Sequence, residues 1–236
     1  MPVEEHPSAG RSSLSLLRTI PLFAGLSGSE LEQLEKMAVC RKVARNTTIV
    51  RAGDKTDSLF VIVSGSAKVL NRDAEGNEVI LTLLAAGECF GEMGLIDGSP
   101  RSADVLANER CELLEMAKTE FAKALAGNVD LCLNIMKSLV QRLREANRKI
   151  ESLALMDVYG RVARLLLDFS EEENGLRVIR RKVSKQDMAK MVGASREMVS
   201  RVMKDLEHSG YIRVEEGRIV LAEDEALFPV AAGSRL

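Results

Sequence analysis

Five polar side chains recur at helical spacing in the C-terminal quarter of this 236-residue chain. They are Arg196, Glu197, Ser200, Arg201 and Lys204. Arginine can donate two hydrogen bonds to guanine, glutamate can accept one from the amino group of cytosine, and lysine is suited to phosphate. Residues at this spacing share one face of an α-helix, so together they could read the edges of bases in double-stranded DNA.

Two short helices joined by a tight turn are predicted to position this group. Ser184 opens a capping motif for a helix over 185–192, and Gly193 ends that helix. Ser195 can cap a second helix over 196–209. This arrangement is typical of a helix-turn-helix, whose second helix presents its first turns to the major groove. On the opposite face, five apolar residues are predicted to point inward: Met198, Val199, Val202, Met203 and Leu206.

The charge of the segment around these helices differs from that of the whole chain. The chain has 33 basic and 35 acidic residues, a net charge of -2. Between Arg177 and Lys204, by contrast, nine residues are basic and two are acidic. The basic ones are at positions 177, 180, 181, 182, 185, 190, 196, 201 and 204. Such an excess attracts the phosphates of DNA, although a solvated charged face on a helical hairpin would have the same composition.

A second group of candidate binding residues lies in the glycine-rich segment 90–103. Gly91 would let the backbone approach a ligand closely, and a helical turn that starts there would offer free N–H groups to an anion. Arg101 would supply the opposite charge. Taken alone, the segment is more typical of a glycine-rich β-turn with an exposed arginine than of a binding site.

The elements that carry this segment are predicted to be β-strands. Short β-branched runs alternate with glycines at 53, 65, 76 and 87, a rhythm typical of an antiparallel sandwich or barrel. The runs cover 48–51, 59–63, 67–71, 79–84 and 112–115. A parallel sheet would need helices of about ten residues between strands, and none fits before Thr119. Ahead of the strands, apolar residues at helical spacing within 14–39 predict a short entry helix.

One long helix is predicted over 129–157, which contains no glycine or proline. Its apolar residues follow one another at alternating spacings of three and four: Val129, Cys132, Met136, Leu139, Leu143, Ala146, Ile150 and Leu153. A helix of about 40 Å is longer than one small domain needs. Because its apolar residues form a heptad repeat, we predict that it pairs with the same helix of a second copy. Alternatively, the stripe packs on the chain's own β domain. The two are compatible because a helix has two sides.

The segment 192–201, Val-Gly-Ala-Ser-Arg-Glu-Met-Val-Ser-Arg, resembles the recognition segment of the cyclic-AMP receptor protein and FNR-type regulators. The resemblance extends over about 14–222. It implies that Arg196, Glu197 and Arg201 read a GTGA-type half-site. The family is dimeric and bends its DNA, so the implied partners are a second copy, an inverted-repeat DNA site and RNA polymerase. The DNA contacts expected on this basis are Ser195, Arg196, Glu197, Ser200, Arg201 and Lys204.

Residues 90–103 likewise resemble the phosphate-binding cassette of cyclic-nucleotide domains. The resemblance implies that Glu92 accepts a hydrogen bond from the ribose 2′-hydroxyl and that Ser102 donates one to the phosphate. The ligand contacts expected on this basis are Gly91, Glu92, Met93, Arg101, Ser102 and Asn147.

The chain departs from the family on the long helix. Where the receptor protein places a Thr-Ser pair against adenine, this sequence has Ala146 and Asn147. Alanine cannot hydrogen-bond through its side chain, whereas the asparagine amide can both donate and accept, so a purine contact remains available with an altered preference. Cyclic AMP is the first choice of effector, with cyclic GMP and cyclic di-GMP as alternatives.

These observations predict an α+β chain in four parts. They are an N-terminal lead (1–19), an antiparallel β-roll that binds a cyclic nucleotide (20–127), a dimerisation helix (128–157) and a winged helix-turn-helix (158–236). The last part is predicted to contain an acidic turn (171–175), a strand (175–183) and a hairpin of 211–214 with 218–221. The chain is expected to be a transcription regulator. An alternative of another class is a cyclic-nucleotide-binding regulatory subunit that acts through a protein partner.

Other classes of protein find little support in the sequence. A redox or haem sensor would need iron ligands, but the four cysteines lie 49, 22 and 21 residues apart and the two histidines are His6 and His208. No nucleophile–base pair or Walker-type loop indicates an enzyme. The N-terminus is polar and no stretch reaches about 18 apolar residues. A cytoplasmic protein without membrane contact or bound metal is therefore expected.

Overall fold

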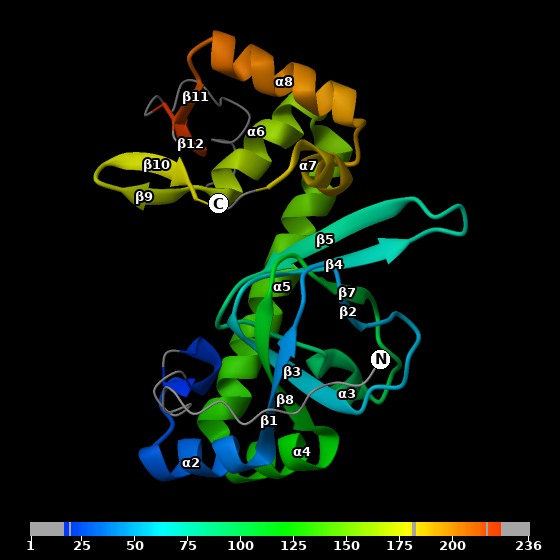
Figure 1. Ribbon diagram of the computed structural model, residues 1–236, viewed down its shortest axis with the longest axis vertical. Helices are drawn as coiled ribbons and strands as arrows, with labels where there is room; N and C mark the ends of the chain where they lie inside the picture. Colours follow the sequence, from blue (N-terminus) through cyan, green and yellow to red (C-terminus); the bar gives the residue numbers. More distant parts are fainter. Residues whose placement is uncertain (1–16, 19, 181–182, 216, 223–236) are drawn as a thin grey trace. The chain divides into compact units, whose positions relative to one another are not determined.

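The computed structural model describes residues 17–18, 20–180, 183–215 and 217–222 (Figure 1). Most of the predicted N-terminal lead, with His6, lies outside these residues, as do Arg181 and Lys182 of the basic segment. The chain divides into two compact units, Met1–Arg142 and Leu143–Leu236. Strands and helices occur in both units, and the predicted α+β class is confirmed.

Two four-stranded antiparallel sheets form the β part of the first unit, which confirms the predicted β-roll. One sheet has the order β1-β8-β3-β6 and consists of β1 (Ala38–Val43), β8 (Cys111–Ala117), β3 (Ser58–Ser64) and β6 (Cys89–Phe90). The other has the order β2-β7-β4-β5 and consists of β2 (Thr48–Val50), β7 (Asp104–Ala107), β4 (Ala67–Arg72) and β5 (Glu78–Leu84). Phe60, Ile62, Phe90, Val105 and Leu113, from both sheets, are buried in one core.

Helices pack on the first of these sheets. They are the 3-10 helix η1 (Pro21–Phe23), α2 (Gly28–Met37), α4 (Lys118–Gly127) and the first part of α5 (Val129–Leu155), and they share a core with β3 and β8. Leu17 is buried in the same core. A capping box starts α2, because Ser27 Oγ accepts from the Glu30 amide and Glu30 accepts from the Ser27 amide. The predicted entry helix is therefore present, but it ends at Met37 and the chain continues as β1.

The long helix α5 confirms the prediction for 129–157 almost to the residue, but its buried side differs from the predicted stripe. Leu131 and Ile135, which the stripe omits, are buried in the core of the first unit, and Leu139 packs partly against that core. The large apolar side chains of α5 that remain exposed are Val129, Leu133, Met136, Val140, Leu143, Ile150, Leu153 and Leu155. Packing on the chain's own domain is thus observed, and a separate exposed apolar row remains.

The described residues of the second unit hold the end of α5, three further helices and a four-stranded antiparallel sheet (Figure 1). The helices are α6 (Val158–Phe169), α7 (Lys185–Val192) and α8 (Arg196–His208), and the sheet has the order β11-β12-β10-β9. Its strands are β9 (Glu171–Glu173), β10 (Leu176–Ile179), β11 (Ile212–Glu215) and β12 (Arg218–Leu221). Val162, Leu166, Met188, Val199 and Leu206 centre the core that joins the three helices. The predicted hairpin is the β11–β12 pair.

The segment 171–175 is not the acidic turn that the sequence predicts. Glu171–Glu173 forms β9 and pairs with β10, and the turn consists only of Asn174 and Gly175, at φ values of 52° and 81°. Consecutive positive φ values are what a two-residue type I′ hairpin requires, and Asn-Gly is its preferred sequence. Because of this pairing, the glutamates of β9 lie beside β10, with Glu172 opposite Arg177.

Candidate nucleic-acid interface and anion-binding cassette

Helices α7 and α8 are held by caps at the predicted residues. Ser184 Oγ accepts a hydrogen bond from the Asp187 amide at 3.0 Å, and Ser195 Oγ accepts one from the Met198 amide at 3.1 Å. Gly193 ends α7 in the left-handed conformation at φ 62°, which a residue with a Cβ rarely adopts. The turn of three residues therefore fixes α8 on α7 through local chemistry that is readable from the sequence.

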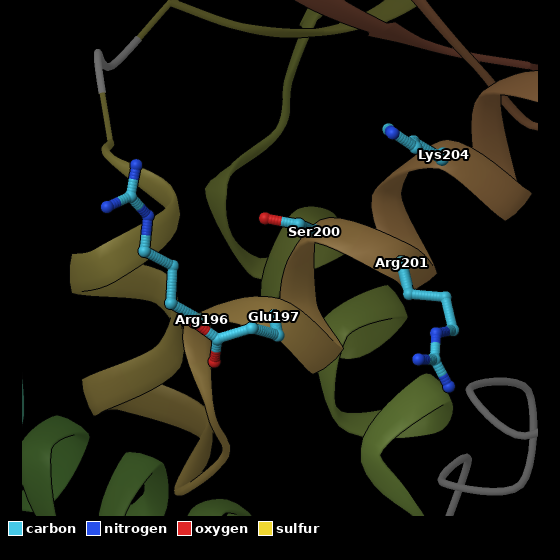
Figure 2. A pocket seen from close by; sticks show the side chains of 5 residues that line it. All are labelled: Arg196, Glu197, Ser200, Arg201 and Lys204. Atoms are coloured by element: carbon cyan, nitrogen blue, oxygen red, sulfur yellow. The ribbon is translucent and has the colours of Figure 1, made fainter.

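The outward face of α8 brings together the five polar residues predicted to contact DNA. Arg196, Glu197, Ser200, Arg201 and Lys204 line one groove, and Figure 2 shows their side chains leaving successive turns of the helix. Ser200 is half-buried and the other four are exposed. A row of two guanidiniums, an ammonium, a carboxylate and a hydroxyl can donate to and accept from base edges and phosphates.

One inward prediction for α8 is wrong. Val199, Val202, Met203 and Leu206 are buried as expected, but Met198 is 46% exposed. At 3.6 residues per turn, position 198 falls at the border of the buried row, on the side of Arg201. Its thioether therefore belongs to the flank of the candidate interface rather than to the core.

Fewer basic side chains of the segment 177–204 lack an acidic neighbour than its nine basic and two acidic residues indicate. Arg180 makes a bidentate ion pair with Glu173 of β9, with its Nη2 2.6 Å from Oε1 and its Nε 3.2 Å from Oε2. This contact raises the pKa of Arg180 and lowers the pKa of Glu173. Arg177 lies opposite Glu172 in the same hairpin. Among the basic residues of 177–204 that the structure describes, those without an acidic strand beside them therefore lie on α7 and α8.

In the first unit, Gly91 and α3 (Glu92–Asp97) shape the cassette. Gly91 caps α3 at φ 85°, a left-handed conformation that favours glycine. A Cβ at this position would meet the guanidinium of Arg101 and would lie 3.1 Å from the carbonyl of Ser58. The close approach that the sequence analysis expects at Gly91 is thus made by the protein's own arginine.

Arg101 is buried, which excludes the interpretation of this segment as a turn with an exposed arginine. Only 7% of the residue is exposed, and its guanidinium lies 5.7 Å from the centre of the Phe60 ring. Its Nη1 donates to the Gly91 carbonyl and its Nη2 donates to Ser58 Oγ, both at 3.2 Å, and Nη2 is 3.6 Å from Asp57 Oδ1. Burial lowers the pKa of Arg101, and the Asp57 carboxylate opposes that shift.

Glu92 is buried as well, and its partner is a residue that the sequence analysis missed. Glu92 Oε1 accepts from Arg142 Nη1 of α5 at 2.5 Å, and the same guanidinium donates to the Cys89 carbonyl. Glu92 Oε2 is buried and has no hydrogen-bond partner in the described part of the chain. A basic residue one turn before Ala146 on the predicted long helix is the only sequence signal for Arg142, and it names no partner.

The remaining expected ligand contacts are placed as follows. Ser102 and Met93 are exposed beside Arg101 and Glu92 in sequence, whereas Asn147 is exposed on α5 and belongs to the second unit. The structure therefore brings Gly91, Glu92 and Arg101 into one cluster. Ser102 and Met93 border it.

Two family models match the chain. The cyclic nucleotide-binding domain matches residues 40–128, and the Crp-like helix-turn-helix domain matches residues 160–228. These matches cover the cassette and the α7–α8 module, and they define a transcription regulator with a ligand-binding domain and a DNA-binding domain.

Curated relatives give the family. The cAMP-activated global transcriptional regulator Vfr of Pseudomonas aeruginosa is 36% identical over 205 residues, which are 81% of this chain and 94% of Vfr. The cAMP-activated global transcriptional regulator CRP of Pasteurella multocida is 34% identical over 187 residues, which are 76% of this chain and 88% of that protein. The chain belongs to the cyclic-AMP receptor protein (CRP) family of transcription regulators, as the resemblance implied.

Solved structures share the fold. CLP of Xanthomonas campestris, described as a c-di-GMP-responsive global regulator, is 30% identical with a TM-score of 0.69, covering 83% of this chain and 99% of CLP. A mutant of CooA from Carboxydothermus hydrogenoformans is 19% identical with a TM-score of 0.74, covering 92% of this chain and 95% of CooA. Among the described residues, none of the helices is long and apolar enough to cross a membrane.

Proposed function

We propose that this protein is a homodimeric transcription regulator that binds an inverted-repeat DNA site with GTGA-like half-sites, with a DNA affinity controlled by a cyclic nucleotide. The observation that carries the proposal is the single groove of Arg196, Glu197, Ser200, Arg201 and Lys204 on the exposed face of α8. Arg196 and Arg201 donate to guanine, Glu197 accepts from cytosine, and Ser195, Ser200 and Lys204 complete the contacts. The protein acts in the cytoplasm, together with RNA polymerase.

The cassette fits a cyclic nucleotide on two observations. The buried Glu92 Oε2 has no partner in the described residues and is suited to accept from a ribose hydroxyl. Arg101 uses two of its five N–H donors on Gly91 and Ser58, which leaves donors for a cyclic phosphate, with Ser102 and the amides at Gly91 and Met93 beside it. Arg142 holds the other oxygen of Glu92 and so orients the carboxylate.

Cyclic AMP is the first choice of effector, because Vfr and CRP are named as cAMP-activated. Cyclic di-GMP is the alternative that CLP supports by its description, and cyclic GMP is a third candidate. Asn147, which stands where the receptor protein has a serine, would contact the purine. Nucleotide binding and DNA binding are reciprocal, so each improves the affinity of the other by the same factor.

Fluorescence anisotropy tests the proposal. A labelled duplex with two inverted GTGA half-sites is compared with one in which both half-sites are scrambled, with and without each of the three nucleotides. We expect tight binding to the first duplex only, and only with one of the nucleotides. The Arg196→Ala/Arg201→Ala variant removes the difference between the duplexes, whereas Lys36→Ala, at an exposed position on α2, keeps it.

Two outcomes would contradict this assignment in different ways. Unchanged sequence preference in the double variant would overturn DNA reading by α8 and favour a regulatory subunit that acts through a protein partner. DNA affinity that is the same with every nucleotide, while calorimetry shows a nucleotide to bind, would overturn the coupling alone.

A further inference from the structure

The exposed apolar row of α5 has a regular pattern with one polar interruption. Val129, Leu133, Met136, Val140, Leu143 and Ile150 are each at least 42% exposed. They follow one another at alternating spacings of four and three if Asn147, also exposed, is counted between Leu143 and Ile150. Ala154 continues the row. We call the eight residues the α5 seam.

The heptad positions of this seam follow from its spacing. Val129, Met136, Leu143 and Ile150 occupy d, and Leu133, Val140, Asn147 and Ala154 occupy a. The residues at g, Cys132, Leu139, Ala146 and Leu153, are apolar, and Leu139 packs toward the core of the first unit. The residues at e are all charged: Asp130, Lys137, Arg144 and Glu151. The seam is therefore bounded by the chain's own core on one side and by charges on the other, and a second copy of the same helix is the occupant that matches it.

Asn147 is then a single polar residue at an a position. In a two-stranded coiled coil, its amide would enter a layer that water cannot reach, where an unpaired amide is costly. In a parallel pair in register, each a residue faces the a residue of the partner, so the two Asn147 amides meet and one donates to the carbonyl oxygen of the other. This bond uses one N–H of one amide and one lone pair of the other, so N–H and carbonyl groups remain for the proposed purine contact. A slip of one heptad would place each Asn147 against Val140 or Ala154 of the partner helix. Antiparallel pairing would place it against a d residue. All of these residues are apolar, so the amide would have no partner.

We infer that Asn147 fixes the parallel orientation and the register of the dimer. The inference rests on the proposed homodimer. A slip of one heptad displaces one helix by about 10 Å along the other and destroys the two-fold symmetry that an inverted repeat requires. The Asn147 layer lowers the affinity of the two helices for one another. In return, only the symmetric, in-register arrangement gives each buried Asn147 amide a hydrogen-bond partner.

The test uses the full chain with a reporter for register. In a Cys40→Ala/Cys132→Ala background, Leu143→Cys places a thiol in the d layer next to Asn147, where it can form a disulfide with its counterpart only in a parallel, in-register pair. Asn147→Leu is added to make the layer apolar. The double substitution Val140→Asn/Asn147→Val moves the asparagine by one heptad. Arg148→Leu, at the exposed b position, is the matched control.

We expect the parent to be a single dimer in sedimentation equilibrium that oxidises almost completely to the disulfide. Asn147→Leu should tighten the dimer by about tenfold while lowering the disulfide yield or adding larger oligomers. The moved asparagine should restore one dimer and a high yield, and Arg148→Leu should change neither. A parent-like yield and a single dimer in Asn147→Leu would overturn the inference and leave the proposed dimer intact. A monomeric parent would overturn both.

Discussion

The α8 surface and the cassette hold their charged groups in opposite ways. On α8, Arg196, Glu197 and Arg201 are exposed on a helix whose buried face is apolar. In the cassette, Glu92 and Arg101 are buried, and each is already held by protein groups. The difference teaches that the exposed side chains of α8 need only a rigid helix beneath them, whereas the buried charges of the cassette also help to stabilise the fold around them. Substitutions should therefore separate function from stability on α8 and should affect both in the cassette.

The largest effect is expected at the ion pair between Glu92 and Arg142. Arg142→Ala leaves a buried carboxylate without its charged partner, so it should lower the free energy of unfolding by about 3 kcal/mol. Urea denaturation measures this loss. Arg148→Ala, on the exposed side of the same helix, should change the free energy by less than about 0.5 kcal/mol. Equal stability of the two variants would show that the cassette charges do not support the fold.

The matching substitution on α8 should change DNA binding alone. Arg201→Ala should weaken binding to the specific site by about 1 to 3 kcal/mol, because a bidentate contact to guanine is lost, and should leave the melting temperature unchanged. Lys204→Ala should instead weaken all duplexes alike and reduce the slope of affinity against salt by about one. Anisotropy titrations at several salt concentrations distinguish them. A lowered melting temperature for Arg201→Ala would remove the contrast between the two regions.

Alkaline pH offers a third test, because Cys89 lies directly before the cassette. Burial raises the pKa of its thiol from 9.0 to about 12. The folded state then retains a proton that the unfolded state releases, so the stability from this group is present below pH 9 and is lost as the pH rises toward 12. The loss should be about 1.4 kcal/mol per pH unit in this window. Cys89→Val should show a shallower slope in denaturation series, and an unchanged slope would refute the assignment.

The smallest effect is expected at the cap of α8. Ser195→Ala removes the acceptor for the Met198 amide and should lower the free energy of unfolding by about 1 kcal/mol, whereas Ser195→Asp should retain most of it. Thermal denaturation of both variants checks this. A larger loss for the aspartate variant than for the alanine variant would show that the hydroxyl acts in another way.

The α7–α8 module can be predicted closely because its signals are local. Ser184, Gly193 and Ser195 set the helix ends within a few residues of the groups that they cap, and a period of 3.6 residues places the outward face. The prediction fails at Met198 because that residue lies at the border between the buried and the exposed face of α8. At such a border, the helical period of 3.6 residues does not determine whether a side chain is buried. The strands are predictable where β-branched runs are long, and β6, with two residues, gives no such signal.

The contacts of the cassette cannot be predicted in the same way. The sequence and its resemblance place Gly91, Glu92 and Arg101 in one segment, but their partners come from distant parts of the chain: Arg142 is 50 residues from Glu92, and Ser58 is 43 residues from Arg101. Nothing local distinguishes these residues from other polar ones. The same holds for the face of α5, where the predicted stripe and the observed α5 seam share their d residues and differ in every other position.

The acidic strand β9 also bears on how the protein finds its site in a genome. A regulator meets a vast excess of random DNA, and every unpaired basic residue prolongs each of those encounters equally. Because Arg180 is paired with Glu173 within the protein, we expect that guanidinium to add less to binding without sequence preference than an unpaired arginine would. The β9–β10 hairpin therefore leaves fewer unpaired positive charges for DNA of any sequence than the composition of this segment indicates.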